Sequence, residues 1–132
     1  MRRAVALLTF GLAACATPSA PPGPIVGKWG GQHVGLEMSA DKGRLDYDCA
    51  AGTIDGSLLG DSSGRFTAVG THTPGTGGPV QAGVVPPSYP ALYSGSVRGD
   101  TMILAVDVAA INARIGPYAL HRGAEPILLR CL

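Results

Sequence analysis

The sequence predicts an all-β protein, built as a small antiparallel barrel of about eight strands in meander order. Apolar and polar residues alternate over short segments along most of the chain, which is the period of a half-buried strand. Turn-forming residues separate these segments about every eight to twelve positions, a spacing typical of barrels and sandwiches. A long 3.6-residue period is missing, and residues 106–114 would form a short helix at most.

Each expected strand follows from its own alternation. Val34, Leu36 and Met38 share one face of a first hairpin, and Leu45 and Tyr47 continue the pattern after a turn at residues 41–43. Further strands are expected at residues 51–55, 65–72, 92–98, 101–108, 115–122 and 127–131, with turns at 99–100 and 123–126. In the strand at 101–108 one face is wholly apolar and is expected in the core: Met102, Leu104, Val106 and Val108.

The first 24 residues differ in character from this domain. Residues 1–14 begin with Arg2 and Arg3, continue as an apolar run and end in small residues, the order of a secretory signal peptide too short to span a membrane. Residues 16–24 hold four prolines and are expected to form an extended tether of up to about 28 Å. The folded domain is therefore expected at residues 25–132.

Leu12-Ala13-Ala14-Cys15 resembles the lipobox of bacterial lipoproteins. The resemblance implies cleavage before Cys15, a diacylglycerol on its sulfur and acylation of the new amino group. Each buried methylene contributes about 0.8 kcal/mol, so such an anchor is effectively permanent. Ala16 after the cysteine, by resemblance to enterobacterial sorting, implies the outer membrane, facing the periplasm. The alternative is a conventional signal peptide cleaved after Ala14 or Ala16.

This interpretation changes the net charge of the chain and the number of cysteines that are free to form a disulfide. Without the signal peptide the chain carries eight basic and nine acidic residues, which indicates neither a nucleic-acid partner nor a basic membrane-surface patch. If lipid modifies Cys15, the remaining pair in an oxidising compartment, Cys49 and Cys131, is expected to form a disulfide. Cys131 shares a strand face with Ile127 and Leu129, so its thiol is expected to point inward, as is that of Cys49.

Gly27-Lys28-Trp29 near the first strand and Arg130 near the end of the chain resemble the Gly-x-Trp and closing basic residue of lipocalin-like (calycin) barrels. The resemblance implies a basic side chain of Arg130 lying over Trp29 and closing one end of the barrel by a cation–π contact. Because a domain of residues 25–132 is short for a ligand-holding barrel, a narrow, filled interior is expected.

Two other resemblances concern function. Trp29-Gly30-Gly31-x-His33 together with Asp48-Cys49-Ala50 and Arg130-Cys131 resembles uncharacterised small bacterial lipoproteins, which implies no activity. Tyr47-Asp48-Cys49, followed by Ser63-Gly64-Arg65-Phe66, is similar to the membrane-bound lysozyme inhibitors, although the final tyrosine of their Ser-Gly-x-x-Tyr loop is missing here.

Catalytic and metal chemistry is not expected. Residues 60–64 match the Gly-x-Ser-x-Gly nucleophile elbow, but a strand follows where that motif requires a helix, so a turn is predicted. His33, His72 and His121 lack the close spacing of metal ligands, and His33 and His121 alternate with apolar neighbours, which places them toward solvent. We expect no enzyme, metal or cofactor.

The function expected from the sequence is that of a non-enzymatic, lipid-anchored envelope protein that presents its barrel as a binding or interaction module, with the membrane and an envelope protein as its partners. The expected surface is the loop at residues 73–90, where nine of 18 residues are Gly or Pro. Its apolar contacts would come from Val80, Val84, Val85, Tyr89 and Tyr93. Alternatively these residues fold back over one end of the barrel. Two other functions stay open: inhibition of a periplasmic lysozyme or protease, and carriage of a small hydrophobic ligand at Trp29.

Overall fold

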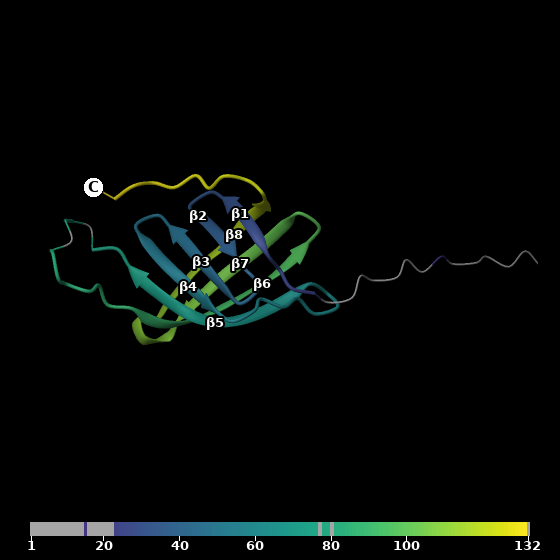
Figure 1. Ribbon diagram of the computed structural model, residues 1–132, viewed down its shortest axis with the longest axis horizontal. Coiled ribbons are helices and arrows are strands. Elements are labelled where there is room, and N and C mark those ends of the chain that lie inside the picture. The colour runs from purple at the N-terminus through teal and green to yellow at the C-terminus, as the bar shows by residue number, and fades with distance from the viewer. Residues whose placement is uncertain (1–14, 16–22, 77, 80, 132) are drawn as a thin grey trace, which may run out of the picture.

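The computed structural model describes Cys15 and residues 23–76, 78–79 and 81–131. Its strands form a closed antiparallel barrel in which each strand pairs with its neighbours in sequence and the last pairs with the first (Figure 1). The predicted all-β, eight-stranded meander is thus confirmed. The strands are β1 (Gly27–Gly31), β2 (Val34–Met38), β3 (Lys42–Tyr47), β4 (Ala50–Asp55), β5 (Arg65–Pro74), β6 (Tyr89–Arg98), β7 (Thr101–Val108) and β8 (Ala113–Arg122).

Short connections explain the meander, because strands joined by two to four residues pair readily with each other. Residues 32–33 and 48–49 make two-residue turns, and His33 and Cys49 both adopt a positive φ there, at 71° and 60°. The short helix expected within residues 106–114 is a single 3₁₀ turn, η1 (Ala109–Ile111). Two connections are longer, at residues 56–64 and 75–88.

Alternation along each strand fills the barrel interior with apolar side chains. Met102, Leu104, Val106 and Val108 on β7 are all fully buried, as the sequence predicts. Each such side chain contributes roughly 1.5–3 kcal/mol when removed from water. Other strands of the barrel add Val34, Leu36, Met38, Leu45, Ile54, Phe66 and Leu120 to the same core.

The barrel has two different ends. At the entry end the chain joins the barrel: Pro24 pairs with Leu59, and the N–H of Ile25 donates to the carbonyl of Leu58 at 2.8 Å. The connections between β2 and β3, β4 and β5, and β6 and β7 lie at this end because the strands alternate in direction. The distal end carries the other four connections, including residues 75–88, which project from it (Figure 1).

Trp29 and Arg122 close the entry end. Trp29 is 1% exposed, and the Arg122 guanidinium lies 4.3 Å from the centre of its ring. Arg122 also pairs with Asp100 in the β6–β7 turn at 3.1 Å. The predicted cation–π contact therefore exists, but the expected partner, Arg130, was wrong. Arg122 is the residue of β8 that pairs directly with Trp29 across the barrel seam, whereas Arg130 lies beyond the last strand.

The strand predicted at residues 127–131 is also wrong. The barrel closes by pairing β8 with β1, so no edge remains for a further strand. The chain turns at Gly123, with φ 72°, and residues 123–131, which we call the strap, cross the outside of β1 to β3. A side chain on Gly30 would meet the carbonyl of Ala124 at 2.2 Å, and one on Gly35 would meet Pro126 at 2.8 Å. Bare backbone at these two glycines lets the strap lie close.

Candidate functional site at the distal end

The β5–β6 connection is the most exposed apolar segment of the distal end. Val84 is 57% exposed and Val85 is 88% exposed. Thr73 and Ser88 join the base of the connection by a hydrogen bond of 3.0 Å, and Thr76 donates to the carbonyl of Gly78 at 3.4 Å. Val80 lies outside the described residues. Exposure of large apolar side chains on a projecting loop is typical of a binding surface.

Two residues assigned to this loop by the sequence belong to β6. Tyr89 begins the strand and is partly buried against the core. Tyr93 is fully buried, and its hydroxyl donates to the carbonyl of Thr71 at 2.6 Å. The expectation that Tyr93 offers a surface contact was therefore wrong, because Tyr93 falls on the inward face of the strand that was expected at residues 92–98.

All four tyrosines of the chain gather toward the distal end of the barrel, together with its one buried histidine. The ring of Tyr47 lies 5.7 Å from that of His72 and 6.1 Å from that of Tyr118. Within the described residues, the hydroxyl of Tyr47 and Nδ1 of His72 are buried without a hydrogen-bond partner. Atoms left without a partner cost about 1–3 kcal/mol each in an apolar interior.

Burial sets the charge of this cluster. It raises the pKa of Tyr47 far above its ordinary value of 10.0, with the neighbouring Tyr93 adding to the effect. Burial lowers the pKa of His72 below its ordinary value of 6.5, so the imidazole is neutral at pH 7. The distal interior is consequently polar but uncharged.

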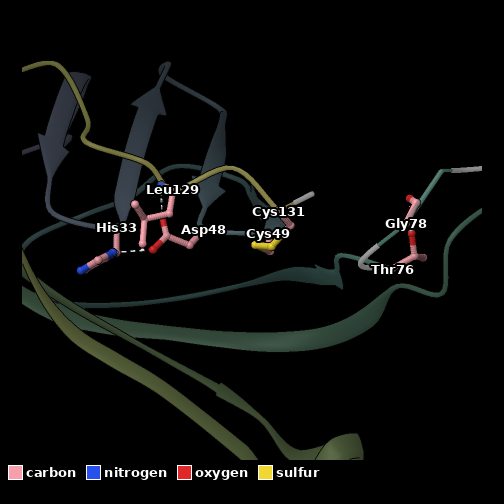
Figure 2. Close-up of a disulfide and its surroundings, with 7 residues drawn as sticks. All are labelled: His33, Asp48, Cys49, Thr76, Gly78, Leu129 and Cys131. Carbon is pink, nitrogen blue, oxygen red and sulfur yellow. Dashed lines mark hydrogen bonds and ion pairs between the residues drawn. A yellow bond between two sulfur atoms is a disulfide. The ribbon is translucent and has the colours of Figure 1, made fainter.

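A disulfide joins the strap to the β3–β4 turn, as Figure 2 shows. Cys49 and Cys131, 82 residues apart, have Cα atoms at 5.3 Å, which confirms the predicted pair. In the chain-entropy model a loop of this length contributes about 4–5 kcal/mol. The expectation that Cys131 faces inward with Ile127 and Leu129 was wrong. These two side chains are 59% and 62% exposed, because the strap lies on the outside of the barrel.

Asp48 fastens the strap beside this disulfide (Figure 2). One carboxylate oxygen accepts a hydrogen bond from the N–H of Leu129 at 2.6 Å, and the other forms a hydrogen bond with Nδ1 of the His33 imidazole. The Leu129 N–H lowers the pKa of Asp48 below its ordinary 3.8; desolvation opposes this shift, and His33 adds to it. His33 and His121 are both exposed, as expected.

The loop at residues 60–64, which matches the Gly-x-Ser-x-Gly motif, lies at the entry end, at the opposite end of the barrel from this site. One carboxylate oxygen of Asp61 accepts the N–H of Ser63 at 2.8 Å, the hydroxyl of Ser63 at 2.7 Å and the N–H of Arg65 at 2.9 Å. This is the predicted turn. The hydroxyl of Ser63 is engaged within the turn, so this loop adds no support to the hypothesis of a hydrolase inhibitor.

The described residues form neither a metal-binding cluster nor a membrane-spanning helix. Among these residues no three His, Cys, Asp or Glu side chains lie close enough together to hold a metal ion. No described helix has the length and apolar character needed to cross a bilayer. Cys15 is exposed and unpaired in the described chain, while the predicted signal peptide and residues 16–22 of the tether lie outside it.

Comparison with known proteins finds no family model, no curated protein and no solved structure that matches the chain. The structure itself is a disulfide-fastened β-barrel that is closed at its entry end and bears its exposed loop, the end of its strap and its polar interior at the distal end.

Sequence reasoning missed the Tyr47–His72–Tyr118 cluster and the strap. A signal for the cluster existed, since Tyr47 shares the inward face of its strand with Leu45, and Tyr93 shares one with Ala91. The strap gave no local signal, because residues 127–131 alternate as a strand would.

Proposed function

We propose that this chain is a non-enzymatic, lipid-anchored protein of the bacterial envelope, and that it binds a protein partner with the distal end of its barrel. The observation that carries the proposal is the placement of two features at opposite ends. Cys15 and the tether precede the entry end, whereas Val84 and Val85 are exposed at the distal end. A lipid on Cys15 would hold the entry end at the outer membrane and turn the β5–β6 connection away from it.

The contacts around Trp29 argue against a ligand cavity at the entry end and favour binding through the exposed loop. Trp29, which the carrier hypothesis would use, is covered by Arg122 and donates its indole N–H to the carbonyl of Val26 at 3.2 Å. A ligand at Trp29 would have to displace both contacts. The exposed loop needs no such rearrangement to meet a partner.

The anchor is tested by growing cells with an alkyne fatty acid and measuring its incorporation into the protein. We expect labelling of the unchanged chain and none of the Cys15→Ser variant. An unlabelled chain, secreted and cleaved, would contradict the lipid anchor.

The loop is tested by placing a photo-crosslinking amino acid at Val85 or, as a matched control, at Val69, which is 63% exposed on the side of the barrel. We expect one discrete crosslinked protein from Val85 in intact cells and none from Val69. The same products from both positions, or none from either, would contradict the loop as the binding surface.

A second function, carriage of a small molecule, is favoured by one observation. The unpartnered atoms of Tyr47 and His72 give the distal interior a donor and an acceptor for a neutral polar group. Native mass spectrometry of protein from the periplasm tests this. A bound mass that disappears in the Tyr47→Phe variant would support carriage, and the bare mass of an oxidised monomer would count against it.

A further inference from the structure

The strap uses only one of its two backbone edges to hold the barrel. The N–H of Ile127 donates to the carbonyl of Gly31 at 3.0 Å, and the carbonyl of Ile127 accepts the N–H of His33 at 2.8 Å. The N–H of Leu129 donates to Asp48 at 2.6 Å. Odd-numbered residues thus face the turns at the distal end. In an extended chain the backbone groups of the intervening residues point the opposite way.

That opposite edge has no partner in the described part of the chain. No described residue makes a hydrogen bond to the backbone N–H or carbonyl of Leu128 or to the N–H of Arg130. An open groove of about 610 Å³ lies beside the strap, lined by Asp46, Ala50, Leu128 and Arg130 among others. A closed barrel has no edge strand, but the strap leaves unpaired backbone groups on its outer surface.

We propose that the strap is a docking site for an extended peptide segment of a partner protein, which pairs with the free edge at Leu128 and Arg130. This inference deepens the proposed function and rests on it for the existence of a protein partner. Main-chain hydrogen bonds to an exposed edge supply the affinity in such strand addition, and alternate side chains supply the specificity. Leu128 offers an apolar contact in the groove, and the exposed Ile127 and Leu129 flank it.

Charge indicates which peptide fits. The guanidinium of Arg130 makes no ion pair with any described residue, whereas the nearby Asp46 is paired with Arg44 at 3.3 Å. A peptide with a carboxylate opposite Arg130 would form an ion pair with its guanidinium. An exposed Arg–carboxylate pair favours the matched sequence modestly. The preferred occupant is therefore an extended, acidic and apolar segment.

A second copy of the strap fits less well. Its free edge also consists of even-numbered residues, so antiparallel pairing sets Arg130 opposite Leu128 or Arg130 of the other copy. In neither register does Glu125, the carboxylate of the strap, stand opposite Arg130. A hetero partner can supply the missing carboxylate.

The strap is also preorganised for this role. Its first residue, Gly123, donates its N–H to the carbonyl of Lys28 at 2.7 Å, and its other end is held by the disulfide to Cys49. Because the scaffold already restrains the strap, a peptide would dock without the cost of ordering a flexible segment.

The probe is the blocked peptide acetyl-Thr-Val-Glu-Val-Thr-amide, titrated into the purified ¹⁵N-labelled chain. We expect saturable shifts of the Leu128 and Arg130 amide signals and slower hydrogen exchange at both. The same peptide with N-methylated valines should bind at least about tenfold more weakly, and the peptide with lysine in place of glutamate about threefold more weakly. Equal binding of all three peptides would overturn the proposal.

Two variants separate the edge from the side chain. Leu128→Pro removes the free N–H but leaves the bonds of Ile127 and Leu129, and should weaken peptide binding by about tenfold. Leu128→Ala keeps the N–H and should lose about threefold at most. Retention of the disulfide mass and of the remaining amide spectrum controls for folding. Equal losses in both variants would overturn backbone pairing.

Other outcomes are equally decisive. Slow exchange of the Leu128 N–H in the free protein would show that the edge is already occupied, and a dimer abolished by Leu128→Pro would assign the edge to a second copy; both would overturn the proposal. Crosslinking at Val85 and lipid labelling at Cys15 do not depend on the strap. Loss of peptide binding alone would therefore leave the proposed function standing.

Discussion

The entry end and the distal end of the barrel interior are built from different chemistry. Around the entry end the buried side chains are apolar, with Trp29, Met38, Leu58, Phe66 and Met102 among them. Toward the distal end the interior holds phenols and an imidazole, of which two polar atoms lack a described partner. Apolar packing stabilises the entry end, whereas buried polar atoms without a partner cost stability at the distal end.

Exposure follows the same division. Ile25 and Leu58 cover the entry end and are 8% and 1% exposed. Tyr89 and Tyr118 at the distal end remain partly exposed. The end that carries the polar interior is thus also the end that solvent reaches, and the loop and the end of the strap lie beside it.

The largest expected effect is at the entry end. Trp29→Ala removes the largest buried side chain and the ring under Arg122, and should lower the free energy of unfolding by about 3–5 kcal/mol. Tyr118→Ala, at a partly exposed distal ring, should cost clearly less. Urea unfolding followed by circular dichroism measures both. Equal losses would remove the distinction between the two ends.

A smaller effect separates two tyrosines of the distal interior. Tyr93→Phe deletes the donor to the Thr71 carbonyl and should lower the free energy of unfolding by about 1 kcal/mol. Tyr47→Phe deletes a hydroxyl that has no described partner and should leave stability unchanged or raise it. If Tyr47→Phe lowers the free energy of unfolding as much as Tyr93→Phe does, the Tyr47 hydroxyl has a hydrogen-bond partner in solution, and the contrast between the two tyrosines is wrong.

The smallest expected effect is a pH dependence from His72. Because burial lowers the pKa of its imidazole in the folded state, the unfolded chain binds the proton first as the pH falls below about 6.5. Stability should therefore decrease from about pH 6.5 down to the folded-state pKa of His72 and then level off. The lowered pKa of Asp48 also stabilises the folded state, but this contribution to stability is lost only as the pH falls below 3.8.

Unfolding in urea between pH 5 and 7 checks this dependence. His72→Gln should flatten the slope, and His121→Gln, at an exposed position, should retain it. A slope that survives in His72→Gln would assign the pH dependence to another group.

Local patterns explain why most strands and the disulfide could be predicted. Alternation between buried and exposed positions is a property of each strand alone, so β2, β3 and β7 are visible as residues 34–38, 42–47 and 101–108. The same pattern misled at residues 127–131, where Ile127 and Leu129 alternate as a buried strand would but lie exposed on the strap. Alternation states which residues share a face, but not what that face meets.

The fold class, the meander order and the pairing of Cys49 with Cys131 can be predicted from the sequence alone, because side-chain period, turn chemistry and cysteine count are local or countable quantities. The closure of β8 on β1 is visible in the folded barrel alone, and it places Arg122 over Trp29 and the strap on the outside. The folded barrel also brings Tyr47, His72 and Tyr118 together from β3, β5 and β8. Contacts between strands so far apart in the chain depend on how the sheet curves and closes, and no segment of the sequence carries that information alone.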